Sequence, residues 1–169
     1  MTAAAEIVLP LSDQISFRPE LPEDEAFLSK LYATTRDVEM ALTGWDAAQQ
    51  EAFLRMQFQF QTTHYRKHYG DASFRIILRD DAPIGRLYVH YGAQEIRLMD
   101  IALLQEHRGT GLGGSILENL LREAAQLGKT VTLHVERFNP ALRLYQRLGF
   151  RVIEDQQINF YMEWRPPAA

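Results

Sequence analysis

Hydrophobic and polar residues alternate along some stretches of the chain and recur at three- and four-residue steps along others. Alternating or short apolar runs are typical of strands, and the longer spacing is typical of helices. The first pattern predicts strands at residues 15–18, 74–78, 84–89, 95–104, 130–136, 150–153 and 158–164. The second predicts a helix that begins near Pro22 and further helices at residues 45–69, 112–127 and 141–148. Together they predict one domain over residues 13–165, preceded by a loose tail at residues 1–12.

Single residues mark where several of these elements begin and end. Gly128 is expected to end the third helix, and Asn139 and Pro140 to cap and open the last one. Residues 39–44 are interpreted as a break between the first two helices, and residues 79–83 as a hairpin turn. The second helix is expected to bury a hydrophobic face made of Phe53, Leu54, Met56, Phe58 and Phe60.

Composition narrows the functional classes. The chain has 169 residues, a formal net charge of −4 and no cysteine. The absence of cysteine excludes disulfides, thiolate catalysis and cysteine-bound metals. The negative charge disfavours a nucleic-acid partner, which usually needs a basic face. No apolar run approaches membrane-spanning length and the N-terminus does not resemble a signal peptide, so we expect no membrane partner and a cytoplasmic location.

The most informative stretch is a glycine-rich turn between a predicted strand and a predicted helix. Four glycines occupy six positions after Arg108, namely Gly109, Gly111, Gly113 and Gly114. The first main-chain N–H groups of a helix lack partners within the helix, and its dipole favours negative charge at that end. Glycines allow an anion to approach this main chain closely. The turn therefore predicts a binding site for phosphate or pyrophosphate.

This turn also carries a family resemblance. Residues 108–113, Arg-Gly-Thr-Gly-Leu-Gly, resemble the Arg/Gln-x-x-Gly-x-Gly/Ala signature of the GNAT superfamily of N-acetyltransferases, and residues 139–150 resemble its second conserved block. The resemblance covers roughly residues 73–164. It implies an α/β (α+β) acyl-CoA N-acyltransferase fold, in which about four helices flank a mixed sheet of about six to seven strands that splay at the cofactor cleft. It also implies acetyl-CoA as co-substrate and makes a homodimer one option.

The resemblance assigns roles to particular residues. It implies that the pyrophosphate lies on the turn, that the pantetheine arm pairs with the strand before it, and that the N–H group of Leu103 binds the oxyanion. Tyr145 is expected to protonate the departing thiolate and Asn139 to contact the pantetheine; six positions apart, they can face one cleft. The expected cofactor-binding residues are Ile101, Ala102, Leu103, Arg108, Gly109, Thr110, Gly111, Leu112, Gly113, Gly114, Ser115, Asn139 and Tyr145.

Two residues compete as the general base. Glu95 lies thirteen residues before Arg108, the offset of the base in the histone-acetylating branch of the family. His134 lies on the polar face of the next strand, at the offset used by the branch that acetylates ribosomal-protein N-termini, and its ordinary pKa near neutrality suits the role. A mechanism without a dedicated base, in which water accepts the proton, also stays open.

Alternative classes are weaker. Residues 109–114 also fit the Gly-x-Gly-x-x-Gly pattern of dinucleotide-binding folds, but four polar residues separate the predicted strand from the glycines and too few residues follow. A non-catalytic acyl-CoA sensor would have no need of Tyr145. His64 and His68 are spaced to share a metal, yet no third ligand is nearby, so no metal site is predicted.

The sequence thus predicts an acetyl-CoA-dependent N-acetyltransferase that uses direct attack in a ternary complex. A small-molecule primary amine is the expected acceptor, because nothing in the sequence marks a peptide groove. A protein N-terminus or a lysine side chain is the alternative within the same fold.

Overall fold

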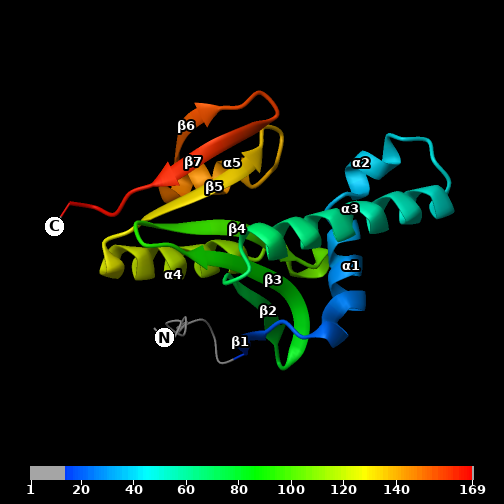
Figure 1. Cartoon of the computed structure of the whole chain (residues 1–169), viewed down its shortest axis with the longest axis horizontal. Helices are drawn as coiled ribbons and strands as arrows, with labels where there is room; N and C mark the ends of the chain where they lie inside the picture. Colours follow the sequence, from blue (N-terminus) through cyan, green and yellow to red (C-terminus); the bar gives the residue numbers. More distant parts are fainter. Residues whose placement is uncertain (1–13, 169) are drawn as a thin grey trace.

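The computed structural model describes residues 14–168 and shows one sheet flanked by helices (Figure 1). The strands are β1 (Ile15–Pro19), β2 (Ser73–Arg79), β3 (Ala82–Tyr91), β4 (Glu95–Leu103), β5 (Thr130–Glu136), β6 (Arg151–Asp155) and β7 (Asn159–Trp164). The helices are α1 (Glu25–Thr34), α2 (Asp37–Ala41), α3 (Ala47–His68), α4 (Leu112–Leu127) and α5 (Leu142–Leu148), with 3₁₀ turns η1 (Pro22–Asp24) and η2 (Gln105–His107). The tail predicted at residues 1–12 lies outside the described residues.

The sheet is mixed, as predicted, and has seven strands in the order β1-β2-β3-β4-β5-β7-β6. Every neighbouring pair is antiparallel except β4 and β5, which are parallel. A dinucleotide-binding fold needs a doubly wound parallel sheet. The described chain forms no such sheet, so that alternative is wrong.

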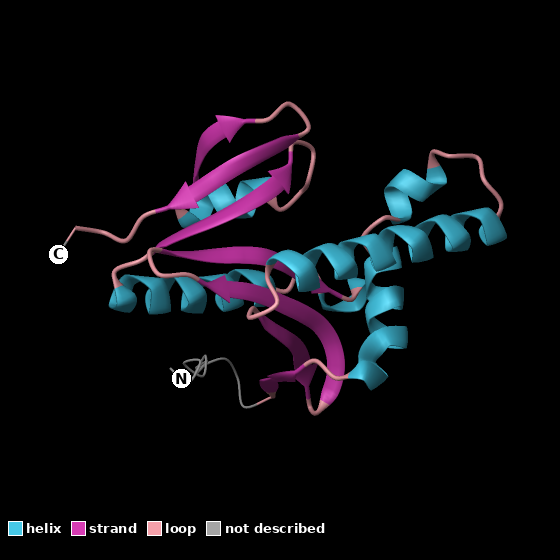
Figure 2. Cartoon of the chain, viewed as in Figure 1, coloured by secondary structure: helices cyan, strands magenta, loops and turns pink. Residues whose placement is uncertain are grey.

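The two faces of the sheet are covered by different helices (Figure 2). Helices α4 and α5 pack on one face over the main hydrophobic core, which includes Ile96, Leu98, Ile116, Leu120 and Leu133. Helices α1 and α3 lie on the opposite face, where a smaller cluster contains Leu28, Tyr32, Phe58, Ile76 and Leu78. We call these the α4 face and the α3 face. Burial of apolar side chains on both faces stabilises the central strands from two sides.

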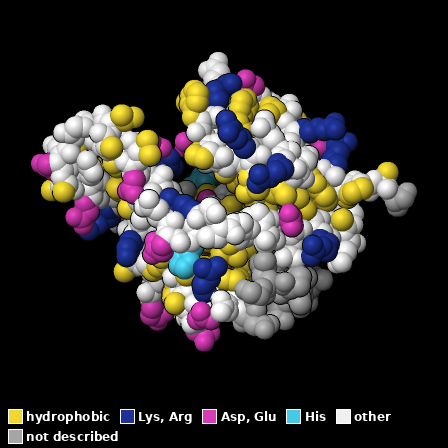
Figure 3. All heavy atoms as spheres, turned by 180° about the vertical axis from the view of Figure 1, so that it is seen from behind, with side chains coloured by type: hydrophobic (Ala, Val, Ile, Leu, Met, Phe, Trp, Pro, Cys, Tyr) yellow, Lys and Arg dark blue, Asp and Glu magenta, His cyan; other side chains and the backbone are white. Residues whose placement is uncertain are grey.

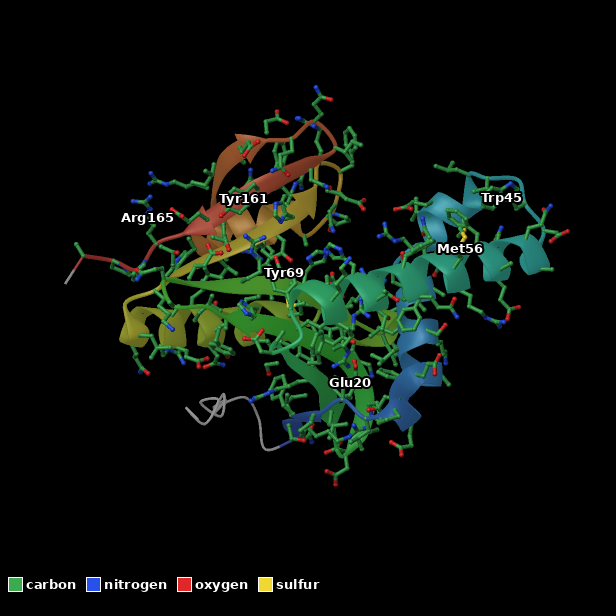
Figure 4. The ribbon with its side chains drawn as sticks, in the orientation of Figure 1. Glu20, Trp45, Met56, Tyr69, Tyr161 and Arg165 are labelled. Atoms are coloured by element: carbon green, nitrogen blue, oxygen red, sulfur yellow. The ribbon has the colours of Figure 1, made fainter. Side chains whose placement is uncertain are left out.

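The structure corrects two helical predictions near the N-terminus. Residues 37–41 form the short helix α2, so the break predicted at residues 39–44 is wrong over its first half. Of the hydrophobic face predicted for α3, only Phe58 is buried, whereas Met56 and Phe60 are 47% and 69% exposed. The reason is that residues two positions apart on a helix point to nearly opposite sides, so Met56 and Phe60 face away from the side that buries Phe58. Helix α2 and the first turns of α3 form a protruding lobe, where Trp45 and Met56 lie close to each other (Figure 4).

Turn and cap predictions were right in kind but shifted in position. The β2–β3 hairpin closes through Asp80 and Asp81, both with positive φ, in a tighter turn than the one predicted at residues 79–83. Gly128 ends α4 in the left-handed conformation, as predicted. Helix α5 begins at Leu142, and Asn139 accepts a hydrogen bond from the N–H of Ala141 in a local turn before the helix rather than capping it.

Candidate active site

The site is built around the place where β4 and β5 separate. Their parallel pairing is limited to three residue pairs, which end at Arg97 and Thr132. Beyond this point β4 continues to Leu103 paired only with β3, and β5 continues to Glu136 paired only with β7. The separation that the family resemblance implied is therefore present. It leaves one edge of β4 with unpaired main-chain groups that a peptide-like arm can satisfy.

The direction of the main chain along β4 decides which groups face this gap. The N–H of Leu104 donates to Ile84 in β3 at 2.8 Å. Because successive residues of a strand point to opposite sides, the N–H groups of Ile101 and Leu103 face the gap. The main chain of Ala102 is directed to β3 instead, which corrects the expectation that Ala102 offers its main chain to the cofactor.

The glycine-rich turn lies directly beyond the end of β4 and exposes unpaired main-chain donors. Within the described chain, the N–H groups of Gly109 to Gly114 have no hydrogen-bond acceptor; the N–H of Ser115 is the first to bond, to Gly111 at 3.0 Å. Gly109 and Gly111 adopt φ of +71° and +83°, which non-glycine residues rarely do. A side chain at either position would meet nothing within 4 Å, so the donors face open space.

Arg108 bonds to the protein rather than to that space. Its Nε donates to the carbonyl oxygen of Leu103 at 2.8 Å, and its Nη2 donates to Thr34 at the end of α1 at 3.1 Å. In this arrangement Arg108 ties the end of β4 to α1. An anion on this turn would then meet mainly main-chain N–H groups, with the positive end of α4 behind them.

Tyr145 approaches the gap from the α4 face. Its ring packs edge-on against Phe150 with 5.7 Å between centroids, and the residue is 8% exposed. The Tyr145 hydroxyl has no hydrogen-bond partner among residues 14–168. Burial raises the pKa of Tyr145, and the charge of Asp100 raises it further, so the phenol stays protonated and can donate.

The two base candidates lie in less suitable places. Glu95 is at the paired end of β4, opposite Thr130, and roughly 25 Å along the strand from Leu103. His134 lies beside the gap on the α3 face, but its Nδ1 is 2.9 Å from Nη1 of Arg97. Arginine can only donate, so Nδ1 of His134 accepts and Nε2 carries the proton. Burial, and then the charge of Arg97, lower the pKa of His134.

One carboxylate in the gap was not predicted from the sequence. Asp100 lies on β4 between Leu98 and Leu103, and its side chain is 26% exposed. It accepts hydrogen bonds from the buried guanidinium of Arg86, which itself is 3% exposed. The signal that could have found it is an acidic residue that follows Ile96 and Leu98 at two-residue steps, because this places it on the buried side of the strand, where charged residues rarely lie without a partner.

The described residues also bear on two other possibilities, a metal ion and a membrane-spanning helix. Between residues 14 and 168, no three His, Asp or Glu side chains gather closely enough to hold a metal ion. His64 and His68 stack with 4.5 Å between ring centroids. None of the helices in the described part of the chain combines the length and hydrophobicity needed to span a bilayer.

Comparison with known proteins gives short sequence matches and extensive structural ones. The chain is 38% identical to human cysteine-rich protein 2-binding protein over 61 residues, covering 36% of this chain and 7% of that protein. It is 40% identical to mycothiol acetyltransferase of Corynebacterium aurimucosum over 57 residues, covering 32% of this chain and 19% of that protein. The chain therefore spans less than a fifth of these curated relatives.

The structural similarity extends over most of the chain. The crystal structure of PaiA N-acetyltransferase from Thermoplasma acidophilum, in complex with coenzyme A, superposes with a TM-score of 0.67 at 20% identity and covers 89% of this chain and 98% of that one. This likeness establishes the fold. The model of the acetyltransferase (GNAT) family matches residues 39–150, which is more than half of the chain. The protein therefore belongs to the GNAT acetyltransferase family.

Proposed function

We propose that the protein transfers the acetyl group of acetyl-CoA to a primary amine on a small molecule, by direct attack in a ternary complex. The observation that carries the proposal is the run of unpaired N–H groups from Gly109 to Gly114, which continues from the unpaired edge of β4. A pyrophosphate on the turn and a pantetheine arm along Ile101 and Leu103 would together satisfy these groups. Coenzyme A carries both parts in this order.

The residues of the gap have complementary roles in this reaction. The amine nitrogen attacks the carbonyl carbon of the thioester, and the negative charge on the carbonyl oxygen is stabilised by the N–H of Leu103. The C–S bond then breaks and the sulfur takes a proton from the hydroxyl of Tyr145, which recovers a proton from water. Thr110, Leu112 and Gly113 contribute main-chain donors to the phosphate site, and Asn139 can offer its side-chain amide to the pantetheine.

The amine must lose a proton before it attacks, and we assign this proton to water. Glu95 is too far along β4 from the acyl group to receive it directly. His134 already uses its free lone pair toward Arg97. The surface is hollowed between the protruding lobe and the body of the molecule (Figure 3), so water can reach the site.

The acceptor is proposed to be a small amine because a relative over 57 residues is named mycothiol acetyltransferase, a name that refers to no protein acceptor. The test is a thiol-release assay with acetyl-CoA and a panel of amines that includes polyamines, aromatic amines, amino sugars and short peptides. Turnover with a non-peptide amine is expected. Turnover with peptides alone would replace the small-molecule acceptor by a protein, and failure to bind acetyl-CoA in a calorimetric titration would end the proposal.

A further inference from the structure

The ion pair between Arg86 and Asp100 has an unusual geometry. Arg86 reaches the same carboxylate oxygen, Oδ2, with Nε at 2.6 Å and with Nη2 at 2.5 Å, and Nη2 also donates to Gln61 at 2.7 Å. Within residues 14–168, Oδ1 of Asp100 accepts no hydrogen bond. The ion pair between Arg18 and Asp24 differs, because there two guanidinium nitrogens bond to two oxygens, each at 2.8 Å.

Asp100 owes its direction to a bulge in β4. Tyr88 pairs with Asp100 and Val89 pairs with Leu98, so Met99 is an extra residue on the β4 side. Tyr65 of α3 donates to the carbonyl oxygen of Met99 at 3.3 Å. The bulge turns Asp100 onto the α3 face, beyond the last residue pair that joins β4 to β5.

Asp100 and Tyr145 therefore flank the gap from opposite faces. Tyr145 belongs to the core on the α4 face. Asp100 lies on the α3 face, where it bonds to Arg86, whose guanidinium stacks over the ring of Tyr88 at 4.7 Å. The charge of Asp100 reaches both tyrosine hydroxyls, because it raises the pKa of Tyr145 and of Tyr65. A thioester in the gap would have a proton donor on one side and a carboxylate oxygen on the other.

We infer that Oδ1 of Asp100 binds the acceptor's ammonium group and orients its nitrogen toward the thioester, an inference that rests on the proposed function. The acceptor class is thus an amine that carries a positive charge at neutral pH. The buried Arg86 holds the carboxylate in place through Oδ2 and leaves Oδ1 for the ligand. A charged hydrogen bond of this kind is stronger than a neutral one.

The role of Asp100 is to hold charge and not to remove the proton. Protonation of Asp100 would leave Arg86 buried without a counter-charge, which is costly. The bound ammonium therefore loses one proton to water, and the neutral nitrogen attacks the thioester carbon. As the C–N bond forms, the nitrogen becomes positive again, and Oδ1 stabilises that charge until the second proton also leaves to water. The sulfur receives its proton from Tyr145.

Two coenzyme A derivatives test this without knowledge of the acceptor. S-(2-aminoethyl)-coenzyme A places an ammonium group two carbons from the sulfur, and S-ethyl-coenzyme A is its neutral counterpart. By isothermal titration at pH 7, the wild-type protein should bind the aminoethyl derivative about tenfold more tightly, as one charged hydrogen bond allows. The Asp100→Asn variant should bind both derivatives alike, with the wild-type affinity for the ethyl derivative.

The control is Asp71→Asn, which removes the same charge from a side chain that is 82% exposed and that contacts His90. It should keep the tenfold preference. If Asp100→Asn fails to fold because Arg86 loses its partner, Asp100→Glu keeps the charge but displaces it, and should reduce the preference without changing the affinity for the ethyl derivative. Equal binding of both derivatives by the wild type, or a preserved preference in Asp100→Asn, would overturn the inference. Binding of neither derivative would instead refute the cofactor site itself, and the inference with it.

Discussion

The two ends of α4 offer a matched pair of substitutions that tests the phosphate site. Gly111 precedes the helix at φ +83° and Gly128 follows it at φ +65°, and a side chain at either would meet nothing within 4 Å. Replacing each glycine by alanine therefore imposes the same kind of backbone strain with no steric clash. Of the two glycines, only Gly111 belongs to the run of unpaired N–H groups.

The expected sizes follow from general magnitudes. An alanine in the left-handed region costs about 1–2 kcal/mol. For a protein of 169 residues, this corresponds to a decrease in Tm of roughly 2–8 °C for each variant. If the methyl group at Gly111 also displaces one charged hydrogen bond to the pyrophosphate, about 1.5–3 kcal/mol of binding energy is lost. The affinity for acetyl-CoA should then fall roughly 10- to 100-fold in Gly111→Ala and stay unchanged in Gly128→Ala.

Thermal melts and calorimetric titrations with acetyl-CoA measure both quantities on the same samples. Similar decreases in Tm would show that the strain is matched, so that the difference in affinity reports the anion site alone. Wild-type affinity in a folded Gly111→Ala protein would refute the assignment of the pyrophosphate to this turn. An equal loss of affinity in both variants would mean that general destabilisation of α4 causes the effect.

Three further changes probe the gap and the fold. Tyr145→Phe should lower kcat by about 10²–10⁴ while the Kd for acetyl-CoA persists, and unchanged turnover would remove the phenol from the mechanism. Arg18 holds the pKa of the buried Asp24 below its usual value. The ion pair therefore stabilises the fold fully above about pH 4, and this stabilisation is lost as the pH falls through the lowered pKa. Asp24→Asn should lower the free energy of unfolding by about 1–3 kcal/mol at pH 7 and weaken its decrease at acidic pH, as measured by urea unfolding at several pH values. The same pH dependence in the variant as in the wild type would contradict this. Gly85→Ala would place a methyl group 2.3 Å from the carbonyl oxygen of Ala102. This overlap should lower the free energy of unfolding by about 1–3 kcal/mol or more and so lower Tm. A wild-type Tm would show that β3 and β4 can move apart.

Periodicity predicted α4 and β5 well because each buries one side in the core. The alternation from Thr130 to Glu136 and the helical spacing from Leu112 to Leu127 match β5 and α4 residue for residue. The glycine turn was predictable as well, since closely spaced glycines directly before a helix are typical of an anion-binding main chain. These features are local, so the order of residues along the chain is enough to find them.

Helix α3 shows where the same reasoning fails. Met56 and Phe60 have the spacing of a buried helical face, yet both are exposed, whereas Phe58 between them is buried. Residues two positions apart on a helix point to nearly opposite sides, so this stretch of α3 has apolar residues on two sides. The spacing alone does not show which side is buried; the packing of α1 and α3 on β2 selects the side that contains Phe58.

The carboxylate of Asp100 was hidden for a more specific reason. Strand side chains alternate with a period of two, so Ile96, Leu98 and Asp100 would all point toward α4 in a regular strand. That register would bury Asp100 in the core, where an acidic side chain without a partner is strongly disfavoured. The extra residue Met99 reverses the alternation, and Asp100 pairs with Tyr88 on the α3 face. A single sequence does not show where a strand has a bulge. An acidic residue at a position that the alternation would bury does, however, indicate one, because a bulge turns that residue to the other face of the sheet.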